Sequence, residues 1–349
     1  MSDKKHLTPV FIIYVDGKRL DTEHEGALRK ITVTDCLNGI ASFSILFDTG
    51  EVKIREKEQI ALESEVSIHL GYKDDVEEIF YGEVTGFRSI FAENESEQLE
   101  VQGNSVLHKL GHAAHFHSYE NKKTSEIIKG IIESYSLKAE IDDFGSTNEF
   151  MSNENCSDIN YIFKAAGMYG KQVYTDGETV FIKDEINART DEIIFEWGKS
   201  LIKFDAFMDT TKLVTEVDLI GWDPVKNESF IGKSTVGELP VKIGGSSDWT
   251  KAAKGASGKY ISNNINLNIK DTDEAKQLTI GLLQRNAYLF LQAYGKSEGN
   301  YKLRPGMRVT IKMVGEDIEG EYMADIVAHT FDKQNGYITE FKLKRNMMQ

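Results

Sequence analysis

Four of the eight histidines in this chain lie within ten residues, at His108, His112, His115 and His117. Imidazole nitrogens bind zinc, and the first two are four residues apart, which would place them on one face of a helix. The helix of a zinc protease carries a glutamate directly after its first histidine, but this chain has Lys109 there. Glu120 is the closest acidic residue, so no third ligand is obvious. We therefore interpret the cluster 108–117 as surface or interface side chains, with His108 and His112 as the metal candidates.

Other patterns that support catalysis are incomplete. The segment Gly255-Ala256-Ser257-Gly258-Lys259 resembles a phosphate-binding loop but lacks the four residues that separate the two glycines of that motif. Neither Cys36 nor Cys156 has a neighbouring histidine or basic residue that would activate its thiol. The many carboxylates leave an Asp/Glu hydrolase open, although a solvated acidic surface explains them more simply. We predict no catalytic residues and no cofactor.

The composition is that of a globular chain with an acidic surface. At 349 residues it is long enough for two or more domains, and its net charge of −15 disfavours nucleic-acid binding, which needs a cationic footprint. The apolar run Val10–Val15 is too short for a signal-peptide core or a membrane span. The two cysteines are far apart in sequence, which favours a reducing compartment. We predict no membrane anchor and no stable nucleic-acid binding.

Residues 1–104 are predicted to form a first β domain. Val66, Ile68 and Leu70 alternate with polar residues, as do the residues near Leu99. A period of two means that one face of each strand is buried and the other is in water. Acidic turn segments separate these runs, so an antiparallel sheet or barrel is expected.

Residues 105–190 are predicted to form a small α+β domain. An apolar stripe over 127–135 indicates a helix that Thr124 can cap. A second helix is expected from Ser157 to a stop at Gly170. A hairpin signal, Asp-Gly between two apolar runs, follows at 176–177 and suits a tight two-residue turn.

Residues 191–349 are predicted to return to strands and to form a second β domain. The segment 225–262 is rich in Gly, Ser and Lys and is expected to be a long loop. Asp271, with a glutamate three residues later, forms a capping box at the start of a helix expected over 272–294. Gly295 is expected to end that helix.

A pattern near residue 66 recurs towards the end of the chain. Val66-x-Ile68-x-Leu70, a turn and Gly82-x-Val84 correspond to Val309-x-Ile311-x-Met313, a turn and Gly320-x-Tyr322. Half-buried antiparallel strands often look alike, so the pattern alone leaves a true repeat open. A true repeat would give the chain two similar barrels, and three such chains would present six similar edges.

Several motifs follow one another in an order that is typical of one known family. Ser157–Ala166 is similar to the family helix S-D-x-x-F-L-x-x-L-A, with Tyr161 in place of the usual phenylalanine, and the Gly170–Ile182 segment follows. The later motifs are Leu219-Ile220-Gly221-Trp222-Asp223-Pro224, the helix start at Asp273, Leu303-Arg304-Pro305-Gly306, Gly320-Glu321-Tyr322, His329 and Tyr337–Phe341. On these motifs the chain resembles the hub proteins of contractile injection machines. These are the late control gene D family of contractile phages and tailocins, and the hub part of type VI secretion spike proteins.

The resemblance implies a structural protein rather than an enzyme. Such hubs are mainly β, with two tube-like antiparallel barrels and a small α+β domain, and three chains form a ring between a six-fold inner tube and a three-fold spike. The implied partners are two further copies of the chain, a spike protein, the inner tube or tube-initiator protein, and baseplate wedge proteins. The tape-measure protein is a further candidate. The resemblance also implies synthesis in the bacterial cytoplasm and assembly into the baseplate of a phage tail or extracellular contractile particle.

The residues expected to serve structure and assembly are Gly221, Trp222, Asp223, Pro224, Pro305, Gly306, Gly320 and Tyr322. Pro305 fixes φ and Gly306 allows a tight turn, which would set the register of the next strand. Trp222 would be a large apolar anchor where a strand leaves the sheet, although core packing would explain it as well. Two other functions stay open: a tail-associated cell-wall hydrolase and a carbohydrate-binding β protein.

Overall fold

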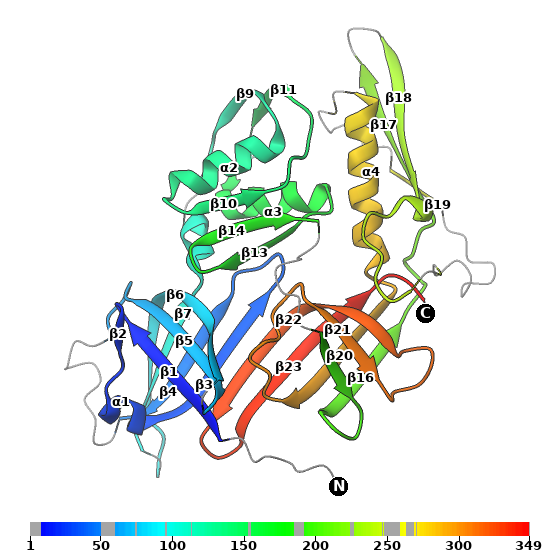
Figure 1. Cartoon of the computed structure of the whole chain (residues 1–349). Coiled ribbons are helices and arrows are strands. Elements are labelled where there is room, and N and C mark those ends of the chain that lie inside the picture. Colours follow the sequence, from blue (N-terminus) through cyan, green and yellow to red (C-terminus); the bar gives the residue numbers. More distant parts are fainter. Residues whose placement is uncertain are drawn as a thin grey trace.

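The computed structural model describes residues 8–49, 60–73, 75–94, 96–112, 114–152, 155–184, 192–223, 227–245, 247, 259–262, 269 and 271–348. A broad sheet forms the lower layer of the molecule in Figure 1. A small α+β unit stands above one side of this sheet, and a long helix with a β-hairpin stands above the other side. None of the helices in the described part of the chain is long and apolar enough to cross a membrane.

The lower layer is one sheet of thirteen strands. Its strands are β1 (Pro9–Val15), β2 (Lys18–Arg19), β3 (Leu28–Cys36), β4 (Ser42–Asp48), β5 (Glu65–Tyr72), β6 (Asp75–Ile90), β7 (Gln98–Asn104), β15 (Ile193–Glu196), β16 (Leu201–Met208), β20 (Leu291–Glu298), β21 (Arg308–Lys312), β22 (Gly320–Asp332) and β23 (Gly336–Arg345). The order is β16-β20-β23-β22-β3-β4-β7-β6-β5-β1-β2, with β21 joined to β22 and β15 joined to β21. Among the strand pairs that the described residues form in this sheet, β15–β21 is parallel and the others are antiparallel. The prediction of a mainly antiparallel β chain is therefore confirmed.

The two halves of the sheet meet where β3 pairs with β22. Residues 30–36 pair with residues 326–332, so hydrogen bonding continues from one half to the other. In the part of the chain that the structure describes, no pair of named strands closes either half into a barrel, although a single bridge between Trp197 and Leu201 joins the end of β15 to the start of β16. The two tube-like barrels and the domain boundaries at residues 104 and 190 therefore stay predictions.

Each half of the sheet covers an apolar core, and the two longest C-terminal strands contribute to both. Phe331 and Tyr337, at the ends of β22 and β23 that face each other, pack in the core of the first half. Val327 and Phe341, a few residues away on the same strands, pack in the core of the second half. Since each half buries its apolar face with the help of these strands, we expect the two halves to stabilise each other.

The helix predicted over 272–294 is shorter in the structure. α4 (Thr272–Ala287) begins after Asp271, whose side chain accepts a hydrogen bond from the amide three residues later. The prediction is wrong beyond residue 287, because β20 starts at Leu291 and its residues alternate in burial, the period of a strand. Gly295 therefore does not end the helix. It pairs with Phe341, whose ring occupies the place where a Cβ of residue 295 would lie.

The segment 225–262, predicted as a long loop, contains two strands, so the prediction is wrong for these residues. β17 (Glu216–Asp223) and β18 (Glu228–Thr235) form an antiparallel hairpin beside α4, β19 (Lys259–Ser262) joins β17, and the short helix η2 (Val236–Glu238) follows β18. The small residues in β18 reflect close packing rather than flexibility. A Cβ on Gly232 would lie 2.4 Å from the backbone of Ala275 in α4.

The α+β unit contacts the sheet at the turn between β3 and β4 and, through η1, at Glu83 of β6. Its elements are η1 (Val106–Gly111), β8 (Ala114–His115), β9 (Ser118–Lys122), α2 (Thr124–Ser134), β10 (Lys138–Ile141), β11 (Asn148–Ser152), β12 (Cys156–Ser157), α3 (Asp158–Met168), β13 (Gln172–Asp176) and β14 (Thr179–Lys183). Asn38, between β3 and β4, donates its amide to the Val173 carbonyl oxygen and accepts the Val173 amide on its side chain. Its side-chain nitrogen also donates to Gln172 at 2.9 Å. This edge contact fixes β13 against the sheet.

The recurring pattern near residues 66 and 309 corresponds to a recurring connectivity. β5-β6-β7 and β21-β22-β23 are both consecutive antiparallel triplets, and the middle strand of each is long, with 16 and 13 residues. Val309 and Ile311 are buried in the same way as Val66 and Ile68. Met313 departs from the pattern, since β21 ends one residue earlier and Met313 has a φ of +64° and is 64% exposed.

Candidate functional site

The structure places His108 beside an acidic residue that the sequence pattern did not indicate. His108 lies in η1, with Nδ1 2.9 Å from the Ser105 carbonyl oxygen and Nε2 3.7 Å from a carboxylate oxygen of Glu83. Lys109 also pairs with Glu83. The rings of His108 and His112 lie in edge contact, with centroids 5.4 Å apart. Among the described residues, no three His, Cys, Asp or Glu side chains are grouped to hold a metal ion.

The Gly221–Pro224 motif marks the end of β17. Gly221 pairs with Phe230, whose ring lies where a Cβ of residue 221 would be, only 2.2 Å away. Trp222 is 50% exposed, so core packing does not account for it. The backbone of Asp223 is still paired in β17, and Pro224 lies outside the described residues. Trp222 is therefore accessible to another molecule.

The turn before β21 contains Pro305 and Gly306. Gly306 has a φ of +84°, which glycine adopts without steric cost. Its amide donates to the Ala324 carbonyl oxygen at 2.7 Å, so the turn fixes the point where β21 meets β22. Arg304 donates to the Ile79 carbonyl oxygen, which connects this turn to β6 in the first half of the chain.

Gly320 and Tyr322 begin β22 and belong to the second core. Gly320 has a φ of +112° and pairs with Ile311. Tyr322 is fully buried, and its hydroxyl donates to the Ile318 carbonyl oxygen. The guanidinium carbon of Arg345 lies 5.0 Å from the centre of the Tyr322 ring. Both residues therefore contribute to packing rather than to chemistry.

The residues Gly295-Lys296-Ser297-Glu298-Gly299 have the G-x-S-x-G spacing of a nucleophile elbow. Such an elbow is a sharp turn from strand to helix that exposes its serine. Here the serine lies within β20, Ser297 is 1% exposed, and its hydroxyl donates to the Glu298 carbonyl oxygen at 2.8 Å. Ser297 is therefore not placed to attack a substrate.

Small uncharged polar side chains line the solvent face of the sheet near its centre. They come from β3, β4 and β7 and form what we call the central polar face: Thr32, Thr34, Ser42, Ser44, Gln102 and Asn104. All of them are at least partly exposed, and they surround a hollow of about 350 Å³. The sequence carries a signal for them, since T-x-T, S-x-S and Q-x-N alternate with apolar residues. Only the strand order brings these three segments together.

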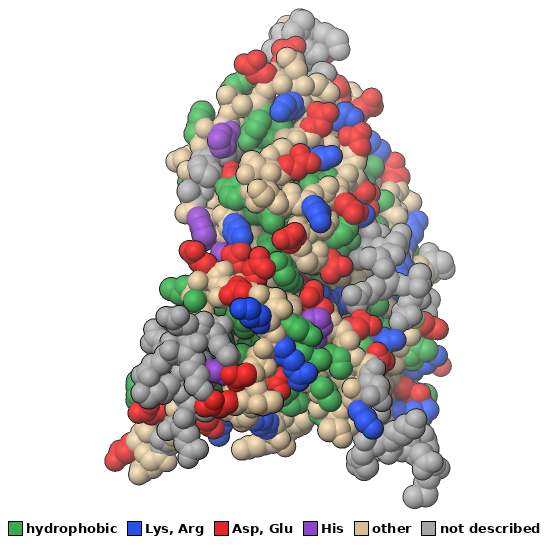
Figure 2. Space-filling view, turned by 60° about the vertical axis from the view of Figure 1, so that its left-hand side comes forward, with side chains coloured by type: hydrophobic (Ala, Val, Ile, Leu, Met, Phe, Trp, Pro, Cys, Tyr) green, Lys and Arg blue, Asp and Glu red, His purple; other side chains and the backbone are tan. Residues whose placement is uncertain are grey.

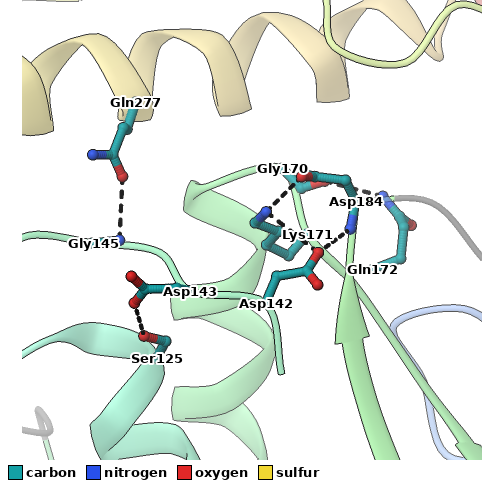
Figure 3. A network of polar contacts seen from close by, with 9 residues as sticks. All are labelled: Ser125, Asp142, Asp143, Gly145, Gly170, Lys171, Gln172, Asp184 and Gln277. Atoms are coloured by element: carbon teal, nitrogen blue, oxygen red, sulfur yellow. Dashed lines mark hydrogen bonds and ion pairs between the residues drawn. The ribbon is translucent and has the colours of Figure 1, made fainter. Parts of the chain in front are cut away.

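A second cavity, of about 170 Å³, lies between the α+β unit and α4. Figure 3 shows Lys171 at this junction, with its ammonium 2.6 Å from Asp184 and 3.7 Å from Asp142. Asp142 also accepts the Asp184 amide at 3.1 Å. From α4, Gln277 accepts the Gly145 amide at 3.2 Å. The contacts of Lys171 lie within the α+β unit, and the Gly145–Gln277 hydrogen bond crosses to α4. Because these polar groups bind one another, they are better suited to stabilise the fold than to bind a ligand.

Replacing Lys171 with methionine is expected to lower the free energy of unfolding by about 1–2 kcal/mol, since Asp142 and Asp184, both still partly hydrated, lose the ammonium that pairs with them. The matched control is Lys129→Met on α2, where the pair with Glu133 is exposed on both sides. That change is expected to cost less than about 0.5 kcal/mol. Urea unfolding measures both, and equal losses in the two variants would contradict a stabilising role for the ion pairs of Lys171.

The fold just described is shared with tail proteins. The 43 kDa tail protein of prophage MuSo2 from Shewanella oneidensis is similar with a TM-score of 0.71 at 12% identity, over 98% of this chain and 100% of that chain. The tail protein of Neisseria meningitidis MC58 is similar with a TM-score of 0.67 at 11% identity, over 97% of each chain. An E. coli component of the type VI secretion system, itself described as similar to the T4 bacteriophage tail proteins gp27 and gp5, gives 0.61 at 10% identity, over 95% of this chain and 76% of that one.

These likenesses define the class of fold, that of phage tail and type VI secretion proteins. The family described as Alg8 N-terminal domain matches residues 5–333. The chain therefore belongs to the Alg8 N-terminal domain family. No curated protein sequence matches the chain.

Proposed function

We propose that this chain is the structural hub in the baseplate of a contractile injection machine, whether a phage tail, a tailocin or a related system. Three copies form a ring that joins the six-fold inner tube to the three-fold spike, and no catalytic step is involved. The fold shared with prophage tail proteins over nearly the whole chain supports this role. The motifs that resemble contractile hubs, from Ser157 to Phe341, support it independently.

The proposal rests above all on one row of residues across the sheet. These nine residues lie directly opposite one another on neighbouring strands, from β16 to β5, and we call them the cross-sheet row: Lys203, Lys296, Glu340, Ala328, Thr34, Ser42, Asn104, Glu83 and Glu65. All are partly or fully exposed, and the middle of the row is small and uncharged. A channel wall needs such a surface, because it is wetted and carries no strong charge of one sign that would retain a passing cargo.

The width of this surface predicts the bore of the ring. Neighbouring strands lie about 4.8 Å apart, so the nine strands of the row span about 43 Å. Three copies joined edge to edge give an inner circumference of about 130 Å and therefore a bore of about 40 Å, which any tilt of the strands would widen.

The remaining features take complementary roles in this proposal. Residues 1–104 and 191–349 supply the two tube-like barrels, and residues 105–190 supply the α+β domain beside them. The turn at Pro305 and Gly306 holds the register of the wall. The exposed Trp222 and its neighbours lie on the β17–β18 hairpin, away from the sheet, where a spike or wedge protein would bind. The inner tube and the tape-measure protein would meet the ring along its axis.

The surface charge agrees with a structural role in a particle that moves cargo. Figure 2 shows acidic side chains spread over the face that comes forward, from the α+β unit down to the sheet, with basic side chains between them. Such a surface lacks the clustered cationic footprint of a nucleic-acid-binding protein. The net charge of −15 opposes the approach of DNA, so stable DNA binding is not part of the proposal.

Cryo-electron microscopy of particles that contain the protein tests the proposal. We expect three copies at the joint between inner tube and spike, with the central polar face towards the bore and a bore of about 40 Å or more. A location on the outside of the particle, or a copy number other than three, would contradict the hub role.

A further inference from the structure

The two ends of the cross-sheet row carry opposite charges. At the β16 end, Lys203 lies directly opposite Lys296. At the β5 end, Glu65 lies directly opposite Glu83, and the Asp16 carboxylate accepts the Glu65 amide at 2.9 Å. Like charges directly opposite each other on neighbouring strands are destabilising. Each end would therefore be stabilised by the approach of the opposite charge.

The two ends cannot neutralise each other within one chain. Along the sheet, eight strand spacings of about 4.8 Å separate Lys203 from Glu65, and six separate Lys296 from Glu83, which amounts to about 38 Å and about 29 Å. The inner residue at each end, Lys296 or Glu83, has an oppositely charged partner nearby. Lys296 lies 3.3 Å from Glu340, and Glu83 pairs with Lys109. The outer members, Lys203 and Glu65, are exposed.

The β16 edge also has the features of a surface that accepts another chain. β16 pairs with β20 on one side, and on its other side a single bridge joins its first residue, Leu201, to Trp197. Within the described ranges no strand pairs with the rest of that side. Ile202 and Phe207 of this edge strand are 48% and 65% exposed. Near the acidic end of the row, Leu62 is 59% exposed. An open strand edge with exposed apolar side chains favours association with another chain.

We infer that copies of this chain join head to tail, with the β16 edge of one copy, including Lys203, against the acidic end of the row in the next copy. Such a contact uses two different surfaces and closes into a ring when the rotation allows. A contact between two identical ends would bring lysines against lysines or glutamates against glutamates, which electrostatic repulsion opposes. The inference rests on the proposed function for the number of copies, and it adds the surfaces through which they meet.

Zero-length cross-linking of the purified full chain tests this contact. A carbodiimide joins a lysine amine to a carboxylate only where the two are in ion-pair contact. We expect mass spectrometry to find Lys203 or Lys296 linked to Glu65 or Glu83, with a yield that rises with protein concentration. Because these groups are about 29 Å or more apart along the sheet within one chain, we expect every such link to join two copies.

Charge reversal provides a second readout, the dissociation constant of self-association measured by analytical ultracentrifugation. Lys203→Glu is expected to raise this constant about tenfold or more, because it places acidic groups against acidic groups. Adding Glu65→Lys to the same chain should restore association, since opposite charges then meet again in every contact. Lys129→Glu, on the exposed side of α2, serves as the matched control and should leave the constant unchanged.

The outcomes separate this inference from the hub proposal. A chain that stays monomeric at every concentration, or links that map to other surfaces, would overturn the head-to-tail contact. A ring seen at the tube–spike joint with different contacts would uphold the hub and refute the contact. Cross-links between the two ends of the row, in a protein that is not found at the tube–spike joint, would support the head-to-tail contact and refute the hub role.

Discussion

Replacing Tyr322 with alanine is expected to lower the free energy of unfolding by about 3–5 kcal/mol. The side chain is fully buried in the second core, where its ring meets Phe204 edge to face, with centroids 6.3 Å apart. Truncation would leave a cavity and remove the hydrogen bond to Ile318. It would also remove the aromatic ring that lies over the guanidinium of Arg345. This buried cation would then lose a cation–π contact that offsets part of the free-energy cost of its desolvation. Urea unfolding followed by circular dichroism measures the loss.

Tyr322→Phe is the matched control for this prediction. It keeps the ring and the packing and removes only the hydroxyl, so a loss of about 1 kcal/mol is expected. If Tyr322→Phe and Tyr322→Ala lower the free energy of unfolding equally, the hydrogen bond rather than the packing would explain the role of this residue. The assignment of Tyr322 to the packing of the second core would then be wrong.

A strand can be predicted from the sequence where apolar and polar residues alternate along it. Val66, Ile68 and Leu70 show a strict period of two, and all three are buried on one face of β5. The helix over 272–294 was extended too far because an apolar run from Tyr288 to Leu291 fits a helix and a strand equally well. Pairing of β20 with β23 decides between them, and that contact lies about fifty residues further along the chain.

Features that depend on strand order could not be predicted in the same way. Glu83 meets His108 only because β6 ends its pairing with β5 beside η1, and no spacing in the sequence reports this. The opposition of Lys203 to Lys296 likewise requires the register of β16 against β20. Gly306, by contrast, was identifiable from sequence, because a glycine after proline is typical of a tight turn.

The stability of the protein is expected to depend on pH through one buried histidine, His329. Its Nε2 lies 3.1 Å from the Leu303 carbonyl oxygen, so this nitrogen carries the proton and donates it. Its Nδ1 then accepts the hydroxyl of Tyr337 at 2.8 Å. The neutral ring therefore satisfies both neighbours. Burial, reinforced by the charge of Arg304, lowers the pKa of His329 to about 3.

The direction of the effect follows from which state binds the proton. In the unfolded chain His329 has an ordinary pKa of 6.5, so that chain binds a proton as the pH falls below this value. The folded chain does not bind it until the pH approaches 3, and unfolding is therefore favoured by acid at about 1.4 kcal/mol per pH unit. The stability that depends on the neutral His329 ring is fully present above the unfolded-state pKa of 6.5. It is lost as the pH falls towards the folded-state pKa of about 3, by roughly 4–5 kcal/mol in all.

Urea unfolding of the wild-type chain and of His329→Gln isolates this contribution, because the other titrating groups are common to both proteins. The stability advantage of the wild type over the variant is expected to shrink by about 2 kcal/mol between pH 7 and pH 5. Leu62→Gln, at an exposed position without a titrating group, should show a constant difference over the same range. A constant difference for His329→Gln as well would mean that the folded chain takes up the proton as readily as the unfolded one. The assignment of a neutral His329 ring between Leu303 and Tyr337 would then be wrong, and so would the assignment of its tautomer.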